Sequence, residues 1–307
     1  MAKGRRTPKK KQTQVASGPV EGRYPIDTGI AELIEDDYTP GGWVLEINGM
    51  ESSHIVLGKP RELDFEYMRW LVAVIEPFVE AHLDPQKLRI THLGGAACSM
   101  ARYLADVYPD SRNTVVELDG KLAQYVRDWF DLPKAPRLKI RVGEARAVTE
   151  SFTPASRDII IRDVFAGYIT PQPLTTLEFT QIAARSLAPG GLYIINCGDD
   201  RSLKGARAEA AAIAQVFEYT CIVADPAMLK GRRKGNIIIA GSNAPLPLAG
   251  EAATAAIAKR LLGGAVPAHY KDDAWVRDFA RSASARRDAS PQLDLKTLDQ
   301  ELRKEDA

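Results

Sequence analysis

The sequence of 307 residues contains only three cysteines, which limits how the fold can be held together. Cys98, Cys197 and Cys221 are odd in number, widely spaced and without a CxxC pair. This pattern supports neither a disulfide framework nor a zinc knuckle. We therefore expect free thiols in a protein of the reducing cytoplasm.

The sequence also lacks long apolar runs and metal-ligand patterns. It has no uninterrupted apolar stretch of about 18 residues, and its basic N-terminus does not lead into an apolar segment. We expect neither a membrane-spanning helix nor a secretory signal. The four histidines (His54, His82, His92 and His269) show no i,i+4 pairing with one another and no cysteine at ligand spacing, so no metal site is expected.

An excess of charge of one sign is lacking as well, because 41 Lys and Arg stand against 40 Asp and Glu. Six of the basic residues and no acid lie in the first 20 residues, which leaves 35 basic and 40 acidic side chains, a formal charge of −5, for the rest. An acidic body is a poor electrostatic match for duplex nucleic acid. We interpret residues 1–20 as a basic disordered tail that could bind nucleic acid or anionic lipid only weakly.

Hydrophobic residues make up 45% of the chain, which is enough for a full core. Residues 21–62 predict a small β element, with strands at Ile30–Ile34, Trp43–Ile47 and His54–Leu57 around turns rich in glycine. Apolar residues then recur at helical spacing from Asp64 to His82, with Asp64 as the expected cap.

Strands and helices alternate from residue 88 onward. The predicted strands are Leu88–Leu93, Thr114–Leu118, Leu138–Val142, Asp158–Ile161, Leu192–Asn196, Thr220–Ala224 and Asn236–Ala240, and the predicted helices are Ser99–Val107, Leu122–Phe130, Leu177–Leu187 and Arg207–Phe217. Such alternation is typical of parallel strands with helices on both faces. We expect an α/β fold in which residues 63–248 form a Rossmann-like, doubly wound, mostly parallel sheet. A helical and polar extension follows at 249–307, and its end, Ser284–Ala307, is expected to be mobile.

In an open α/β sheet ligands bind beyond the carboxyl ends of the strands, so the residues there are candidates for a site. The first strand runs into Gly94-Gly95-Ala96-Ala97, where small residues let the backbone pass close to a ligand at the start of a helix. Glu117 lies 23 residues after Gly94, near the end of the second strand and followed by Asp119. That interval is typical of nucleotide sites in which an acid accepts hydrogen bonds from the ribose hydroxyls.

The third and fourth strands also end in acids. Glu144 follows Val142-Gly143, where it could accept a hydrogen bond from the exocyclic amine of an adenine while Ala145 leaves room for the ring. Asp163 follows the strand expected at the centre of the sheet, where a carboxylate suits a general base or a ligand for a cationic substrate. Asp163 could instead cap a turn, because Asp is frequent after strands.

Together these segments resemble the spermidine synthase (polyamine aminopropyltransferase) family, a branch of the class I S-adenosylmethionine-dependent methyltransferase fold. The resemblance covers about residues 40–245 and rests on Leu93–Gly95, Val115–Asp119, Val142–Ala145, Asp158–Asp163 and the turn Leu187–Gly191. It implies that Glu117 binds the ribose of decarboxylated S-adenosylmethionine and that Glu144 contacts the adenine. The nucleoside-binding set is Gly94, Gly95, Glu117, Asp119, Glu144 and Ala145. Asp163 would accept a proton from an attacking amine such as putrescine, and a homodimer is implied.

Three positions depart from the family pattern. Ala97 and Ala166 stand where the family has an Asp, and Phe65-Glu66-Tyr67 stands where it has Tyr-His-Glu. Two alternatives therefore stay open: a methyltransferase that uses S-adenosylmethionine itself, since Ala97 does not repel a methionine carboxylate, and a non-catalytic nucleoside-binding protein. His54 and Tyr168 are further candidates for substrate contacts, whereas the strand pattern around His92 indicates a packed side chain.

Overall fold

Two sheets make up the part of the chain that the computed structural model describes, residues 18–246 and 251–289. The strands are β1 (Gly22–Ile26), β2 (Gly29–Glu35), β3 (Gly42–Ile47), β4 (Met50–Val56), β5 (Arg89–Leu93), β6 (Arg112–Glu117), β7 (Leu138–Val142), β8 (Arg157–Arg162), β9 (Leu187–Asp199), β10 (Tyr219–Ala224), β11 (Gly235–Ser242) and β12 (His269–Lys271). The helices are α1 (Glu66–His82), α2 (Ser99–Val107), α3 (Gly120–Trp129), α4 (Ala145–Glu150), the 3-10 helix η1 (Gln172–Leu174), α5 (Leu177–Ser186), α6 (Lys204–Val216), α7 (Pro226–Leu229), α8 (Glu251–Leu262) and α9 (Asp273–Ala280).

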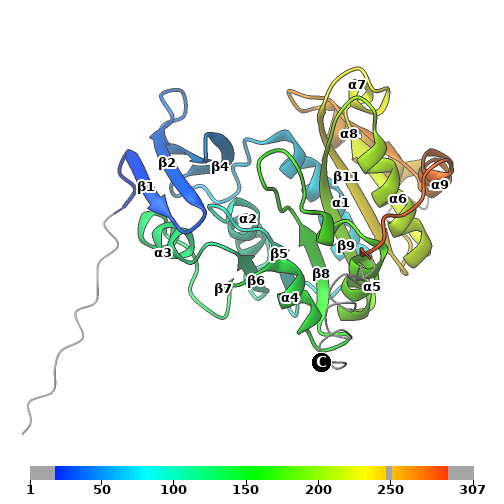
Figure 1. Ribbon diagram of the computed structural model, residues 1–307, viewed down its shortest axis with the longest axis horizontal. Coiled ribbons are helices and arrows are strands. Elements are labelled where there is room, and N and C mark those ends of the chain that lie inside the picture. The colour runs from blue at the N-terminus through cyan, green and yellow to red at the C-terminus, as the bar shows by residue number, and fades with distance from the viewer. Residues whose placement is uncertain (1–17, 247–250, 290–307) are drawn as a thin grey trace, which may run out of the picture.

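Strands β1 to β4 form an antiparallel sheet in chain order, and the other eight form a sheet in the order β12-β10-β11-β9-β8-β5-β6-β7 (Figure 1). Strands β5 to β9 are parallel to one another, as in the register Ile90↔Ile159 between β5 and β8. This arrangement confirms the predicted α/β fold class, a mostly parallel, doubly wound sheet preceded by a small β element.

The last strands are the antiparallel part of this mostly parallel sheet. β11 pairs antiparallel with both β9 and β10, and β12, which the sequence did not indicate, adds to β10. Only the ten residues 225–234 join β10 to β11, with the single-turn α7 among them. A parallel crossover needs a dozen or more residues, so this connection makes the two strands antiparallel neighbours.

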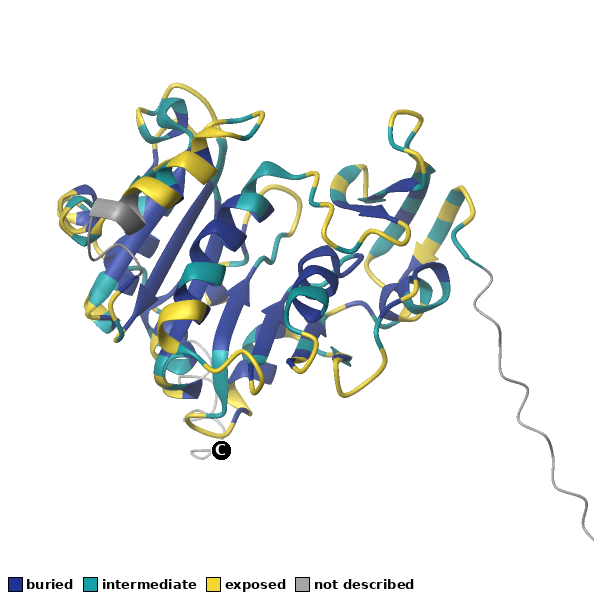
Figure 2. Cartoon of the chain, turned by 180° about the vertical axis from the view of Figure 1, so that it is seen from behind, coloured by how far each residue is buried: buried dark blue, intermediate teal, exposed yellow. Residues whose placement is uncertain are grey.

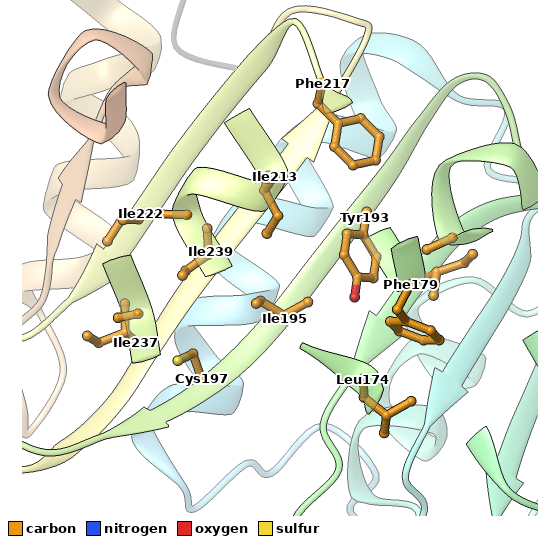
Figure 3. Packing of buried hydrophobic residues seen from close by; sticks show 14 of the residues in the cluster. Leu174, Phe179, Tyr193, Ile195, Cys197, Ile213, Phe217, Ile222, Ile237 and Ile239 are labelled. Carbon is orange, nitrogen blue, oxygen red and sulfur yellow. The ribbon is translucent and has the colours of Figure 1, made fainter. Parts of the chain in front are cut away.

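Helices cover both faces of the large sheet, as Figure 2 shows by the burial of its strands between them. Helices α1, α2 and α8 pack on one face, where alternate strand residues such as Ile159 and Ile161 meet them. Helices α4, α5, α6 and α9 pack on the other face, which receives Ile160. Figure 3 shows this second layer, in which Tyr193 and Ile195 of β9 lie among side chains of α6 and β11.

The small sheet packs against the large one through α2 and α3. Its inner residues, Leu33, Leu45 and Ile55 among them, share a buried cluster with Val126 and Trp129 of α3. β1, which was not predicted, contributes Tyr24, whose ring lies 4.8 Å from that of Trp129. A small antiparallel sheet is marginal alone, and here one face is covered by the same chain.

Two local predictions are wrong. Phe65, not Asp64, is the N-cap residue of α1, and it makes no side-chain capping bond. Strand β9 already begins at Leu187, inside the predicted turn, because Leu187 pairs with Arg157 of β8 across a register shift.

The C-terminal segment Ser284–Ala307 was expected to be mobile, but the part up to residue 289 makes defined backbone contacts. Arg286 forms a parallel bridge with Thr176, and its carbonyl accepts the N–H of Leu177 at 2.8 Å. Residues 290–307, like residues 1–17 of the basic tail, lie outside the described residues. Cys98, Cys197 and Cys221 are free thiols, as predicted, and the structure shows that all three are buried. None of the helices within 18–246 and 251–289 is both long and apolar enough to cross a membrane.

Candidate functional site

Strands β5, β6, β7 and β8 bring their carboxyl ends to one edge of the large sheet. Backbone pairing continues past the strands. The N–H of Gly94 donates to the carbonyl of Val116 at 3.0 Å, and the N–H of Asp163 donates to that of Leu93 at 2.8 Å. The glycine turn and Asp163 are thereby held in fixed positions relative to each other and to β6.

The turn after β5 brings the backbone very close to β8. Gly94 has a φ of +88°, and a Cβ added there would lie 2.0 Å from the carbonyl oxygen of Asp163, so only glycine fits. Ala96 and Cys98 also have positive φ values of 41° and 64°, which L-residues rarely adopt. Strained backbone of this kind concentrates at binding sites.

Glu117 closes this turn from the end of β6. Its Oε2 accepts the N–H groups of Gly95 and Ala96, both at 3.1 Å, and its Oε1 accepts the N–H of Asp119 at 3.0 Å. Burial raises the pKa of Glu117, while these three donors act in the opposite direction. The carboxylate is thus oriented beside the turn. Because each oxygen can accept more than one bond, it can still receive ribose hydroxyls.

The ends of β6 and β7 present apolar side chains to water. Leu118 is 60% exposed, and Val142, the strand partner of Glu117, is 55% exposed. Glu144 is exposed just beyond Val142, where its carboxylate caps α4 by accepting the N–H groups of Arg146 at 2.9 Å and Ala147 at 2.8 Å. Apolar surface beside a few placed polar groups is the usual lining of a ligand site. Sequence reasoning missed Leu118 and Val142, although both directly adjoin predicted site residues.

Ala145 and Asp119 are both buried. Ala145 is buried in the core cluster. Asp119 is 1% exposed; its Oδ1 accepts the N–H of Leu122 at 2.8 Å as the N-cap of α3, and its Oδ2 accepts the N–H and the hydroxyl of Thr28 at 2.7 and 2.9 Å. Both oxygens of Asp119 thus tie the β1–β2 turn to α3, and a contact of this side chain with a nucleoside stays a prediction.

Asp163 meets two neutral donors. Its Oδ2 accepts the hydroxyl of Tyr67 from α1 at 3.0 Å, and its Oδ1 accepts the Nδ2 of Asn196 from β9, also at 3.0 Å. Burial raises the pKa of Asp163, with Asn196, Tyr67 and Arg162 opposing that rise. Burial also raises the pKa of Tyr67, with Asp163 adding to the effect, so the phenol remains a donor. A carboxylate with a raised pKa at a strand end is suited to accept a proton.

Tyr67 and Asn196 are functional candidates that sequence reasoning missed. Asn196 was the last residue of a predicted strand, so the rule that ligands bind at carboxyl ends could have identified it. Tyr67 belongs to the segment that departs from the family pattern, and its partner lies 96 residues away in the sequence. Only the packing of α1 on the sheet brings the two together.

The remaining candidates lie apart from these contacts. His54 is buried, with its Nε2 3.0 Å from Oδ2 of Asp36. Tyr168 is 68% exposed, and the Nζ of Lys234 lies 4.9 Å from its ring centre. His92 is packed as predicted: it is buried, its ring nitrogen lies 3.0 Å from Oδ1 of Asn113, and burial lowers its pKa to about 4.

Ala97 and Ala166 stand at positions where the family has an Asp, and neither has a carboxylate next to it in the sequence. Ala97 is buried and donates its N–H to the Oγ of Ser53 at 3.1 Å, which ties the turn to β4. Ala166 is exposed and donates its N–H to the carbonyl of Ile169 at 2.9 Å. Across the residues that the structure describes, no group of three or more His, Cys, Asp or Glu side chains could hold a metal ion.

The fold and this edge define the class of the protein. A doubly wound α/β sheet with a strained glycine turn, an acid at the end of the second strand and a half-buried carboxylate after the fourth is a Rossmann-like protein of the class I methyltransferase type. Human methyltransferase-like protein 13 in complex with SAH shares this fold at 18% identity, a TM-score of 0.50, and coverage of 76% of this chain and 99% of that one.

No protein-family model matches the chain. A solved structure described as a probable spermidine synthase from Corynebacterium glutamicum is 58% identical, with a TM-score of 0.87, and covers 90% of this chain and 99% of that one. The polyamine aminopropyltransferase of Vibrio vulnificus is 28% identical over 114 residues, which are 36% of this chain and 38% of that protein. The chain therefore belongs to the spermidine synthase (polyamine aminopropyltransferase) family. Its match spans about two fifths of the length of that curated relative.

Proposed function

We propose that the protein transfers an aminopropyl group from decarboxylated S-adenosylmethionine to an amine such as putrescine. The observation that carries this proposal is the carboxylate of Asp163 at the carboxyl end of β8, with its pKa raised and its two oxygens oriented by Tyr67 and Asn196. Family membership indicates the class of reaction, and the sheet edge offers the matching chemistry.

The donor would bind along the ends of β5, β6 and β7. In this proposal the backbone at Gly94 and Gly95 lies against the nucleoside, and the ribose hydroxyls donate to Glu117, which the turn already orients. The adenine would lie by Leu118 and Val142, and Glu144 could accept a hydrogen bond from its exocyclic amine while Ala145 provides a small neighbour. No metal takes part in this arrangement.

Asp163 would act on the acceptor. An amine is an ammonium ion at neutral pH and has no lone pair for attack, so Asp163 first accepts its proton. The neutral nitrogen then attacks the carbon next to the sulfonium. The new C–N bond forms as the C–S bond breaks, the bonding pair stays on sulfur, and methylthioadenosine leaves. The proton on Asp163 passes to solvent, and alignment of nitrogen, carbon and sulfur supplies much of the rate.

The acceptor would be held less firmly than the donor. Ala97 and Ala166 provide no charge for an ammonium group, so the attraction for a diamine falls mainly to Asp163 and the other acids at the strand ends.

We further propose that the protein is a cytoplasmic homodimer. In such a dimer the second face of the β1–β4 sheet is the one available to the partner, and light scattering tests the mass.

The test is release of methylthioadenosine from decarboxylated S-adenosylmethionine with a panel of diamines. Asp163→Asn should lower kcat by about 10² to 10⁴, because a general base is lost, while the affinity for methylthioadenosine stays within about twofold. Asp158→Asn, a matched change at the amino end of β8, should leave kcat nearly unchanged.

Two results would count against the proposal. One is wild-type protein that releases no methylthioadenosine with any amine. The other is calorimetry in which S-adenosylmethionine binds more tightly than its decarboxylated form, which would favour methyl transfer.

A further inference from the structure

Arg162 directly precedes Asp163, and alternation along a strand directs its side chain to the opposite face of the sheet. It is 0% exposed, and its Nη2 lies 2.6 Å from the Oε2 of Glu209 in α6, which is itself 6% exposed. Buried ion pairs lose much of their attraction to desolvation and often add less stability than apolar residues of similar volume. A role other than stability is therefore the better account of this pair.

Arg162 also reaches the segment that follows Asp163 in the chain. Its Nη1 donates to the carbonyl oxygen of Leu174 at 3.3 Å, at the end of η1. Arg162 thus joins Glu209 on α6 to the point where the chain returns from the carboxyl edge of the sheet.

Residues 164–171, here called the edge segment, are consequently held on both sides by two consecutive residues, Arg162 at the end of β8 and Asp163 directly after it. The start is fixed by Asp163, whose N–H donates to the carbonyl of Leu93 at 2.8 Å. The end is fixed by Arg162 through Leu174. Between them the edge segment lies against β9, where a Cβ added at Gly198 would be 2.9 Å from the ring of Phe165, and Tyr168 and Ile169 are 68% and 72% exposed.

We infer that Arg162 is a positioning residue that, by joining Glu209 to Leu174, holds the edge segment beside Asp163 and so fixes the approach of the acceptor amine. This inference rests on the proposed function for its kinetic consequence. Its structural consequence, a tethered edge segment, does not depend on any activity.

The variant pair Arg162→Met with Glu209→Leu separates positioning from stability. It replaces the ion pair by apolar side chains, leaves no buried unpaired charge and removes the donor to Leu174. The matched control is Arg89→Met with Asp158→Leu. It removes another ion pair of β8, with atoms 2.6 Å apart, at the amino end of the strand and far from the edge segment.

Hydrogen exchange measured by mass spectrometry on the full chain gives the first readout. We expect faster deuterium uptake over residues 165–174 in the Arg162/Glu209 variant and unchanged uptake there in the Arg89/Asp158 control. Unchanged protection of residues 165–174 in a folded Arg162/Glu209 variant would overturn the inference, whether or not the protein transfers aminopropyl groups.

Steady-state kinetics gives the second readout. The Arg162/Glu209 variant should lose about tenfold or more in kcat and show a raised KM for the amine, with the KM for the nucleoside donor unchanged, because misplacement affects only the acceptor side. Arg162→Lys keeps the charge beside Glu209 but cannot donate to two partners in the same fork geometry, so it should fall between the wild type and the double variant. An equal loss of affinity for both substrates would indicate general damage and contradict a positioning role.

Discussion

At the scale of single residues, the site depends on how Asp163 divides its two oxygens between neutral donors. Each oxygen accepts one bond, from Tyr67 and from Asn196, and retains capacity for a further donor such as a substrate ammonium. Burial makes the ionised carboxylate less favourable, and the two donors restore part of that loss. The pKa of this group is therefore set by contacts that single substitutions can remove.

Tyr67→Phe should move the acidic limb of the pH–rate profile to higher pH. The hydroxyl of Tyr67 lowers the pKa of Asp163, so its loss raises that pKa further. Because the base must be deprotonated to act, activity should then fall at a higher pH than in the wild type. The measurement is kcat/KM for methylthioadenosine release between about pH 5 and 9.

Tyr103→Phe is the matched control for this change. The hydroxyl of Tyr103 donates to Oε1 of Glu76 at 2.6 Å, which is the same pairing of a phenol with a carboxylate at another place in the fold. Its pH profile should coincide with that of the wild type. An acidic limb that stays in place or moves to lower pH in Tyr67→Phe would contradict the assignment of Asp163 as the base.

At the scale of elements, the glycine turn after β5 combines two constraints at one position. Gly94 needs a positive φ and also has no room for a Cβ, whereas Gly167 in the edge segment has a φ of +65° with nothing within 4 Å of an added Cβ. These two glycines therefore separate backbone strain from steric contact.

Gly94→Ala should be far more damaging than Gly167→Ala. The Gly167 change costs about 1 kcal/mol of left-handed strain. The Gly94 change adds an overlap with the carbonyl of Asp163, which must push β5 and β8 apart, so we expect a loss of about 3 kcal/mol or more and weaker methylthioadenosine binding. Chemical denaturation and calorimetry measure the two effects. Equal free energies of unfolding for the two variants would show that the close approach is relieved at little cost.

Much of the element pattern was predictable because it depends on local periodicity. α2 and β7 have the predicted bounds, and most other strands and helices of the large sheet differ by one to three residues. The prediction failed where pairing partners decide the structure. β12 has three residues and no signal of its own, and the start of β9 at Leu187 follows from its bond to β8. The sequence places acids after the strands, but whether such an acid accepts bonds from the glycine turn, like Glu117, or from the interior, like Asp119, depends on Thr28 and other distant donors.

At the scale of the whole molecule, the C-terminal segment returns to the elements that flank the site. Arg286 pairs with Thr176, and Asp288 pairs with Arg146 of α4 with an N–O distance of 2.5 Å. The same Arg146 donates to the carbonyl of Pro173 in η1 at 3.0 Å. Residues 286–288 therefore tie α4, η1 and α5 together, although Ser284–Asp288 has no hydrophobic pattern from which the sequence could have predicted it.

Asp288→Ala should lower the free energy of unfolding by about 1 kcal/mol at pH 7, because Arg146 and Asp288 are both partly exposed and water screens their attraction. Arg146 lowers the pKa of Asp288. A carboxyl whose pKa is lower in the folded state contributes stability above its unfolded pKa and loses it as the pH falls through the folded value. The difference between wild type and variant should therefore be constant near neutral pH and shrink below about pH 4.

Urea denaturation over this pH range measures the difference. Asp278→Ala is the control, because Asp278 and its partner Arg281 are 70% and 81% exposed and their ion pair should add little stability. A difference that is absent at pH 7, or that grows as the pH falls, would show that the ion pair does not hold the segment in place.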